Sequence, residues 1–406
     1  MHVSRHSLIY GLSYALDIAG KNNLSHSKST AYIAVAIGRE LGMSEPAILK
    51  LYYASLLHDI ALSNTYDIEK HCIDGEKMLS KLPLSKTIAK AVRYHHEYYD
   101  GSGAFGISGK EIPLDALIIR FASDFDDTFG KHVDQFEICL YIIVCEWLEM
   151  QTPLFPEKIT SAFARLIKRE TFLLDYFNTE TKYALSKKLV IDDDVFYGYF
   201  DVVKFAHCFA DIIDCKSTFT HTHSNGIANL ARRAAKIKGY DIETQHKMYI
   251  AGLLHDIGKL DVSSDILHKD GPLTPEERFE INKHTYYTRK ILEQIEGFED
   301  IVSYASNHHE KIDGTGYPNR IEGEKLSELE KIMAICDIFQ ALTEERPYRK
   351  TLPPEKVWAI IEDMVANGHL DSKLVADMKP NLYKEKPPEP KKPSLMQQSI
   401  FITRKD

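Results

Sequence analysis

The chain has 406 residues, of which 44% are hydrophobic and 27% are charged, and its formal net charge is −9. This length exceeds that of a typical single domain and predicts two or three domains with hydrophobic cores. The acidic balance argues against a general nucleic-acid-binding surface, although a local basic pocket or a metal cluster would still admit a small anionic substrate.

The apolar segments and the cysteines indicate neither secretion nor a membrane span. The first ten residues lack the apolar run of a signal peptide, and the longest strongly apolar stretch, residues 138–145, is far shorter than the roughly 20 residues of a membrane helix. The cysteines form no CxxC pair, so we expect free thiols. They are Cys72, Cys139, Cys145, Cys208, Cys215 and Cys336. The sequence therefore predicts a cytoplasmic protein.

Apolar residues recur at helical spacing almost throughout the chain, for example over residues 227–237 and 357–365, and alternating strand patterns are scarce. The prediction is an all-α fold of two tandem helical bundles, over residues 1–195 and 196–380. Residues 131–195 are expected to close the first bundle and connect it to the second. The segment 381–406 is rich in proline and lysine and is expected to be disordered.

An internal repeat is the most informative feature of the sequence, because seven His and Asp positions recur in the same order in each half. In the first half these positions are His26, His58, Asp59, His71, His95, His96 and Asp124. In the second half they are His223, His255, Asp256, His284, His308, His309 and Asp337.

Three intervals of the repeat are identical in the two halves. They are 32 residues (58 − 26 and 255 − 223), 24 residues (95 − 71 and 308 − 284) and 28 residues (124 − 96 and 337 − 309). One interval differs, because the second half holds 16 extra residues (29 − 13) around positions 259–278. Matched intervals with matched residue types indicate a duplication.

The repeated residues are suited to metal binding. Each His–Asp pair follows an apolar run, AGLLHD or ASLLHD, which predicts polar side chains at the buried end of a helix, where they are costly unless paired or bound to metal. Five imidazoles and two carboxylates exceed the needs of one four-coordinate zinc and suit two ions bridged by a carboxylate. The pattern contains no cysteine, so iron or manganese is expected, with nickel or zinc as alternatives. Two such ions lower the pKa of water and neutralise phosphoryl charge, which predicts phosphoester hydrolysis.

The motifs of the second half resemble the HD-GYP family of bacterial cyclic-dinucleotide phosphodiesterases, a branch of the HD phosphohydrolases. The resemblance covers about residues 200–380. It rests on DCKSTFTHTHS at 214–224, HDIGK at 255–259, ILHKDGPLTPEE at 266–277, HHEKIDGTGYP at 308–318 and DIFQALTEERPYRK at 337–350.

The resemblance implies roles for these residues in the second half. One metal would be bound by His223, His255, Asp256 and Asp337, and the other by His284, His308 and His309, with Asp256 bridging. Asp256 and Lys259 would be catalytic, with Lys259 contacting the scissile phosphate or assisting the leaving group. Substrate phosphates and bases would be held by Lys259, Tyr317, Arg346 and Arg349. A surface turn held by salt bridges is the alternative for the two arginines.

Two further features of the second half bear on the site. Some family members have a glutamate four residues before the first histidine that supports a third metal, but Phe219 stands there in this chain, so two ions are expected. Gly314, Gly316 and Pro318 around Tyr317 predict a loop that shapes the substrate groove, with glycine permitting unusual backbone angles.

The first half keeps all seven ligand positions and is expected to form a second metal site, but it has lost the substrate-binding residues. Leu62 stands where Lys259 does, and Phe105 belongs to the sequence DGSGAF that replaces DGTGYP. Three interpretations stay open: a regulatory or ligand-sensing partner, a docking surface for dimerisation, and a weak hydrolase for another substrate. Regulation or structural support is favoured.

The resemblance implies that the protein opens a cyclic dinucleotide, cyclic di-GMP or 3'3'-cyclic GMP-AMP, to the linear dinucleotide. A cyclic-dinucleotide receptor without turnover and a generic HD nucleotidase are the alternatives. Lys259 and the complete ligand set weigh against the receptor, and DGTGYP and RPYRK weigh against the nucleotidase. No nucleic-acid polymer or membrane is expected as a partner, and a homodimer is left open.

Overall fold

The computed structural model describes residues 1–20, 25–61, 67–132, 138–178, 193–216, 222–269, 271–344 and 351–382. These residues form helices almost exclusively, which confirms the predicted all-α fold. Within these ranges the only strands are the two-residue β1 (Val3–Ser4) and β2 (Phe196–Tyr197), which pair antiparallel. No helix in the described ranges is both long and apolar enough to cross a membrane.

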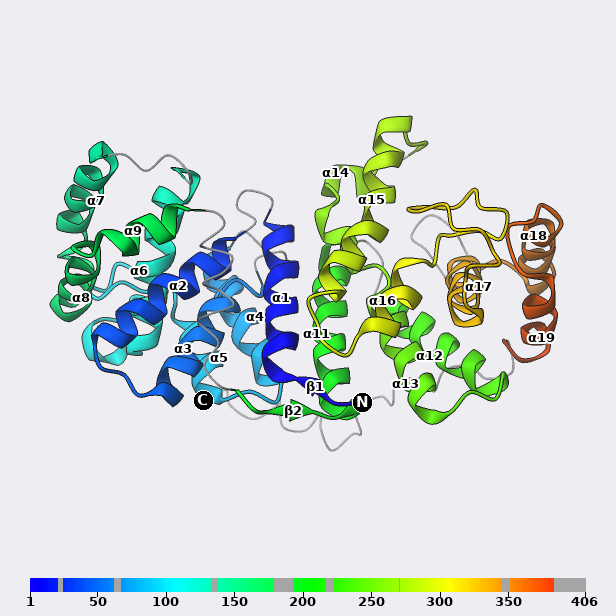
Figure 1. Ribbon diagram of the computed structural model, residues 1–406, viewed down its shortest axis with the longest axis horizontal. Coiled ribbons are helices and arrows are strands. Elements are labelled where there is room, and N and C mark those ends of the chain that lie inside the picture. The colour runs from blue at the N-terminus through cyan, green and yellow to red at the C-terminus, as the bar shows by residue number, and fades with distance from the viewer. Residues whose placement is uncertain are drawn as a thin grey trace, which may run out of the picture.

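The first half of the chain forms the helices on the left of Figure 1. They are α1 (Arg5–Ala19), α2 (His26–Glu40), α3 (Glu45–Leu56), α4 (Ile68–Ser80), α5 (Lys86–Arg93), α6 (Leu114–Phe129), α7 (Ile138–Gln151), α8 (Glu157–Ile167) and α9 (Glu170–Phe177), with 3-10 turns η2 (Gly109–Glu111) and η3 (Gly130–His132). Helices α2 to α6 carry the ligand positions. Helices α7 to α9 close the bundle, with Phe163 of α8 packing edge-on against Phe121 and Phe125 of α6.

The second half forms the helices on the right of Figure 1. They are α11 (Tyr199–Lys216), α12 (Thr222–Ile237), α13 (Ile242–Leu254), η4 (Ile257–Asp261), α14 (Ser264–Leu267), α15 (Pro275–Leu292), α16 (Glu299–Ser306), α17 (Glu328–Thr343), α18 (Pro354–Ala366) and α19 (Ser372–Leu382). The start of α17 is fixed by a capping box in which Ser327 and Glu330 satisfy each other's backbone N–H groups. The same device, from Thr274 and Glu277, begins α15.

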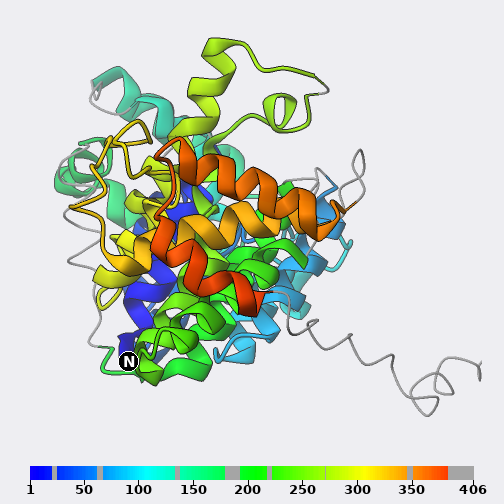
Figure 2. The ribbon, with the colours of Figure 1, turned by 90° about the vertical axis from the view of Figure 1, so that its right-hand side faces the viewer.

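The 16 extra residues of the second half build α14 and lengthen the start of α15. The histidine of the repeat shows this, because His71 lies in the first turn of α4 whereas His284 lies in the middle of α15. The added yellow-green segment rises above the rest of the second half at the top of Figure 2.

Helix α1 joins the two halves. It contacts η4, α11 and α15 of the second half as well as α2 and α3 of its own. Gly11 of α1 lies so close to α15 and the turn after it that a Cβ atom there would be 2.6 Å from the side chain of Ile295. The boundary between residues 195 and 196 stays a prediction, and α1 makes the two halves share part of their packing.

Several sequence predictions can be compared with the described residues. Cys72, Cys145, Cys208 and Cys336 are free thiols, as expected. The side chains of Cys139 and Cys215 lie outside the described part of the chain, as do Leu62, Phe219, Arg346, Arg349 and residues 383–406 of the tail.

Candidate metal centres

The His–Asp pair of the second half lies at the end of α13, where the apolar run AGLLHD predicts it. His255 is the residue after the last turn of α13, and its Nδ1 atom donates to the carbonyl oxygen of Gly252 at 2.9 Å. Gly252 lets α12 approach closely, because a Cβ atom there would be 2.6 Å from the Cα atom of Ala228. This approach brings His223 of α12 beside His255 and Asp256, with one ligand atom of each residue within 4.8 Å of the others.

The two oxygens of Asp256 face different histidines. Oδ2 lies 3.2 Å from Nε2 of His255, and Oδ1 lies 3.4 Å from Nε2 of His284. Helix α15 brings His284 close because it packs directly on η4: a Cβ atom at Gly258 would lie 1.8 Å from the carbonyl oxygen of His284. Asp256 therefore lies in the position of a bridging carboxylate.

The remaining ligands come from α17 and from the turn after α16. His308 follows α16, and its Nε2 atom is 3.3 Å from Nε2 of His284. Asp337 of α17 lies 3.8 Å from Nε2 of His255 through one oxygen and 3.9 Å from Nδ1 of His309 through the other. The structure thus brings together all seven positions that the repeat singles out in the second half.

The electrostatics of this cluster suit metal binding. Burial, with the charge of neighbouring His308 and Lys259, lowers the pKa of His284 to about 3, and burial with the charge of His255 lowers that of His308 to about 4. Burial alone would raise the pKa of Asp256, but the charges of His255 and Lys259 outweigh it and hold the pKa well below its usual range. The charges of Asp256 and Asp337 outweigh burial at His255 and raise its pKa, so this ring must lose a proton when it binds a cation. His284 and His308 are neutral beside an ionised carboxylate, which are the protonation states that bind divalent cations.

One buried nitrogen supports the same interpretation. Nε2 of His255 makes no hydrogen bond within the described ranges. Its ring is fixed through Nδ1, so Nε2 presents a lone pair to the cluster. This nitrogen faces Oδ2 of Asp256 at 3.2 Å, and a metal ion bound by both atoms would satisfy the two groups. The residues present therefore fit two divalent ions.

Sequence reasoning missed the side chain that orients His223. Nδ1 of His223 lies 2.6 Å from a carboxylate oxygen of Glu344, at the end of α17, and such a carboxylate orients a ligand histidine. The repeat could not reveal this partner, because in the first half the equivalent His26 is held by Asp126, 2.8 Å away, from a different place on its helix.

Tyr317 lies at the rim of the cluster. Its ring centroid is 4.8 Å from that of His309 and 6.3 Å from that of His284. Glu310 holds this loop in place, because its carboxylate accepts hydrogen bonds from the backbone N–H groups of Asn319 at 2.7 Å and Ile321 at 2.9 Å. Glu310 is the second residue that sequence reasoning missed, although it belongs to the quoted HHEKIDGTGYP motif.

The glycines of this loop act in two different ways. Gly314 has a φ of 73°, which confirms the expected unusual backbone angle. Gly316 has no positive φ. A Cβ atom at Gly316 would be 2.4 Å from the backbone nitrogen of Lys311, so this glycine is required for close packing of the loop.

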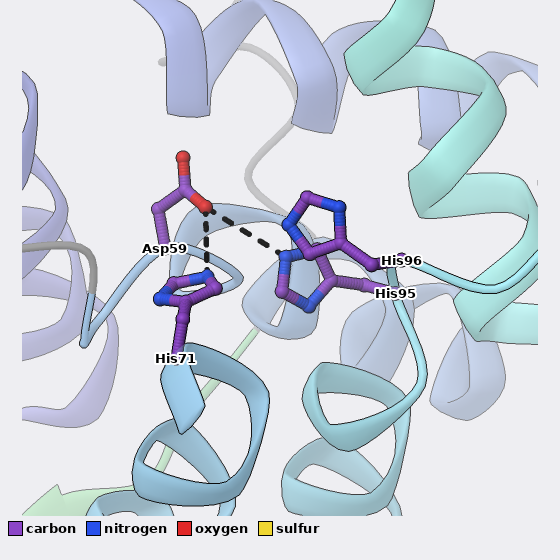
Figure 3. Close-up of side chains that lie close together, drawn as sticks. All are labelled: Asp59, His71, His95 and His96. Atoms are coloured by element: carbon purple, nitrogen blue, oxygen red, sulfur yellow. Dashed lines mark ion pairs between the residues drawn. The ribbon is translucent and has the colours of Figure 1, made fainter. Parts of the chain in front are cut away.

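The first half places its own cluster around Asp59, as Figure 3 shows for His71, His95 and His96. One oxygen of Asp59 lies 3.3 Å from Nε2 of His71 and 3.7 Å from that of His95. The other oxygen lies 3.4 Å from Nε2 of His58, which is itself 3.3 Å from Nε2 of His26. Six of the seven predicted ligand residues of the first half therefore lie close together.

Asp124 departs from this pattern. Its oxygens are engaged by the guanidinium of Arg120, at 3.0 Å, and by the hydroxyl of Tyr98, at 3.1 Å. No ion pair or hydrogen bond within the described ranges joins it to the five histidines. The prediction treated Asp124 as equivalent to Asp337, and the structure shows that the two carboxylates have different neighbours.

Two family models, both described as HD domain, match residues 23–127 and 207–374. Each match spans the complete ligand set of its half, and together they cover about two thirds of the chain. The chain belongs to the HD-domain family. Its first HD domain surrounds Asp59, and its second HD domain surrounds Asp256 and carries the HD-GYP signature.

Known relatives match this two-domain HD protein to different extents. The 3'3'-cGAMP-specific phosphodiesterase 1 of Vibrio cholerae serotype O1 is 29% identical over 399 residues, which are 92% of this chain and 90% of the relative. A cyclic di-GMP phosphodiesterase of Pseudomonas aeruginosa is 31% identical over 176 residues, 43% of this chain and 42% of the relative. The crystal structure of a cyclic GMP-AMP-specific phosphodiesterase of V. cholerae has a TM-score of 0.70 to this chain, covering 95% of it and 99% of the solved chain at 24% identity. This likeness supports the tandem helical fold.

Proposed function

We propose that the second HD domain hydrolyses a bacterial cyclic dinucleotide to the linear dinucleotide with two divalent ions. The observation that carries this proposal is the position of Asp256, whose two oxygens face His255 at 3.2 Å and His284 at 3.4 Å. Two ions bound there would lower the pKa of water and neutralise charge on the phosphoryl group. One ion would be held by His223, His255, Asp256 and Asp337, and the other by Asp256, His284, His308 and His309.

Lys259 is proposed to contact the phosphodiester. It lies on η4, partly exposed at the cluster, and its ammonium group forms an ion pair with Asp256. An ammonium at this place can hold a phosphate oxygen or stabilise the departing alkoxide. Lys259→Met is expected to lower kcat while leaving the metal content unchanged, which metal analysis and turnover measured on the same sample would check.

Tyr317 and one further cation are proposed to hold the rest of the substrate. The Tyr317 ring beside His309 offers an aromatic face for a nucleobase. Arg278, which is exposed on the added segment, lies close enough for its charge to act on the pKa of Tyr317. We therefore add Arg278 to Arg346 and Arg349 as a candidate phosphate contact.

Among cyclic dinucleotides, 3'3'-cyclic GMP-AMP is the substrate that the comparisons favour. The cGAMP-specific relative matches this chain over both HD domains, whereas the cyclic di-GMP relative from P. aeruginosa matches 43% of the chain. The preference is tested by competition between the two dinucleotides. A larger kcat/KM for cyclic di-GMP would contradict it.

Iron or manganese is the proposed metal, since the described ligands are imidazoles and carboxylates without a thiolate. A cytoplasmic location and a homodimer are lesser parts of the same proposal. Cell fractionation and light scattering of the purified chain would check them.

The function is tested with purified full-length chain loaded with manganese or iron(II). Chromatography is expected to show the linear dinucleotide, and His284→Ala is expected to remove turnover together with metal from the second domain. The exposed Glu324→Ala provides a control for handling and loading. Tight binding of cyclic dinucleotide without any linear product would instead identify a receptor.

A further inference from the structure

An arginine contacts the edge of the ligand cluster in the first HD domain. Arg120 is on α6, one helical turn before Asp124, and its side chain is only 17% exposed. One guanidinium nitrogen is 2.7 Å from Nδ1 of His96. The other is 2.6 Å from the hydroxyl of Tyr98 and 3.0 Å from Asp124. Arg120 thus engages two of the seven residues that the repeat assigns to metal binding.

The second HD domain has no such cation at the equivalent place. The position four residues before Asp337 is Met333, a fully buried apolar residue of α17. Without an arginine between them, His309 and Asp337 lie 3.9 Å apart and face the cluster. Arg120 is therefore specific to the first domain, although the ligand positions around it are the same.

The hydrogen bond from Arg120 decides which nitrogen of His96 carries the proton. A guanidinium can only donate, so Nδ1 of His96 must accept and the ring must be neutral. The single ring proton then sits on Nε2, which cannot offer a lone pair to a metal. Figure 3 shows this ring next to that of His95, on the side of the cluster that faces Asp59 and His71.

The ring of His71 is also less well oriented for metal binding than that of its counterpart, His284. In the second domain, Nδ1 of His284 donates to the carbonyl oxygen of Ile281 at 2.6 Å, which fixes the ring with Nε2 toward the cluster. Within the described ranges neither ring nitrogen of His71 makes a hydrogen bond. Ligand histidines are normally oriented by such a partner. Nε2 of His71 faces Asp59 at 3.3 Å, but of His71, His95 and His96 only His95 has its ring held at Nδ1 by a carbonyl oxygen, that of Val92 at 2.6 Å.

The other position of the first domain is intact. Asp126 holds Nδ1 of His26 at 2.8 Å, and the carbonyl oxygen of Ser55 holds Nδ1 of His58 at 2.7 Å. The Nε2 atoms of these rings lie 3.3 Å apart, within hydrogen-bond distance of each other, and Asp59 lies 3.4 Å from that of His58. Two oriented imidazoles and a carboxylate make a three-ligand site that leaves further coordination positions for water.

We infer that the first HD domain binds a single divalent ion through His26, His58 and Asp59, and that the hydrogen bond from Arg120 to His96 prevents a second ion from binding. A single ion cannot hold the attacking and leaving oxygens of an in-line displacement as a pair of ions does. The first domain is then a one-ion site without two-metal phosphodiesterase chemistry. This inference is separate from the proposed activity of the second domain.

Metal content of the full-length chain tests the inference without any activity measurement. After loading with manganese and gel filtration, elemental analysis is expected to give about three ions per chain, two in the second domain and one in the first. The double variant Asp256→Asn/His284→Ala should retain about one ion, and adding Asp59→Asn should remove it. About two ions or none in the double variant would overturn the inference. An unchanged count of about three in the double variant would instead refute the proposed site of the second domain.

The role of Arg120 is tested in the same double-variant background. Arg120→Met copies Met333, and we expect it to raise the count from about one ion to about two. Arg165→Met, at an exposed arginine paired with Glu40, is the matched control and should leave the count unchanged. Arg120→Lys keeps the positive charge, so its count should stay at about one ion. A count that does not change in a folded Arg120→Met protein would overturn the assignment of Arg120.

Discussion

At the scale of single residues, the side chains that orient ligands matter as much as the ligands. Glu344 fixes His223 through Nδ1 at 2.6 Å, and it is nearly as buried as the ring. Glu344→Ala is expected to weaken metal binding by the second domain about 10- to 100-fold, because His223 loses its orientation and basicity. Metal titration of the purified variant checks this, with the exposed Glu324→Ala as control. Equal affinity in native protein and Glu344→Ala would show that His223 needs no such support.

The buried imidazoles also predict how the metal-free protein responds to acid. Burial lowers the pKa values of His58 and His284 to about 3 and of His308 to about 4, so below pH 6.5 the unfolded chain binds protons that the folded chain does not. Stability should therefore fall as pH decreases, by about 1.4 kcal/mol per pH unit for each group. Asp17 and Asp124 act in the opposite direction, because burial raises their pKa values to about 6. His26 contributes little, because Asp126 outweighs burial and raises its pKa to about 9, so below pH 6 it is mostly protonated in both states.

The imidazoles outnumber the two carboxylates, so the net effect between pH 6 and 5 is a loss of at least about 1.4 kcal/mol. Urea unfolding of the metal-free chain at both pH values would measure this loss. A metal-free chain that is more stable at pH 5 than at pH 6 would contradict the assignment of neutral imidazoles.

At the scale of elements, the close packing of η4 on α15 holds Asp256 against His284. A Cβ atom at Gly258 would lie 1.8 Å from the carbonyl oxygen of His284 and 2.5 Å from the nitrogen of Thr288, both of them backbone atoms that cannot move aside cheaply. Gly258→Ala is expected to destabilise the chain by about 1–3 kcal/mol and to weaken metal binding.

Thermal unfolding and metal titration test this expectation together. Gly198→Ala is the control, because a Cβ atom there meets nothing within 4 Å. An alanine at position 258 that leaves both measurements unchanged would mean that the two elements can separate without harm. The equivalent residue of the first domain is already alanine, Ala61, which is fully buried.

The contact of α1 with the second domain is an independent element-scale test. Gly11→Ala places a methyl group 2.6 Å from the side chain of Ile295, so it should lower the free energy of unfolding by about 1–3 kcal/mol. Ile295→Ala alone should cost about 2–5 kcal/mol, since this residue is 2% exposed. The double variant should cost less than the sum, because the smaller side chain makes room for the methyl group. Strict additivity in urea unfolding would indicate that α1 does not pack there in solution.

At the scale of the whole molecule, the sequence predicts the helical fold and the placement of most ligands because duplication preserves spacing. The equal intervals predict that His255 and His58 lie at the ends of equivalent helices, and the structure confirms both positions. Asp124 shows the limit of this reasoning: it is at the right spacing, yet Arg120 holds it away from the histidines. Equal spacing in the sequence does not reveal a new neighbouring side chain one turn along the same helix.

The orienting carboxylates show the same limit. Asp126 follows Asp124 by two positions, whereas Glu344 follows Asp337 by seven, although both hold the first histidine of their site. Each domain fixes that ring from a different point on the helix, so the repeat could not pair them. Three-dimensional contacts were needed to find them.

The most direct test of the account compares the same substitution in the two domains. Turnover of 3'3'-cyclic GMP-AMP is measured for Asp256→Asn and for Asp59→Asn, with the exposed Asp300→Asn as control. Turnover by Asp256→Asn is expected to fall at least about 100-fold, because removing a metal ligand should weaken metal binding more than removing the residue that orients a ligand. The loss of turnover in Asp59→Asn should be smaller by a factor of at least about ten, since the chemistry takes place in the second domain. Substantial turnover in Asp256→Asn, or a comparable loss in Asp59→Asn, would contradict the account.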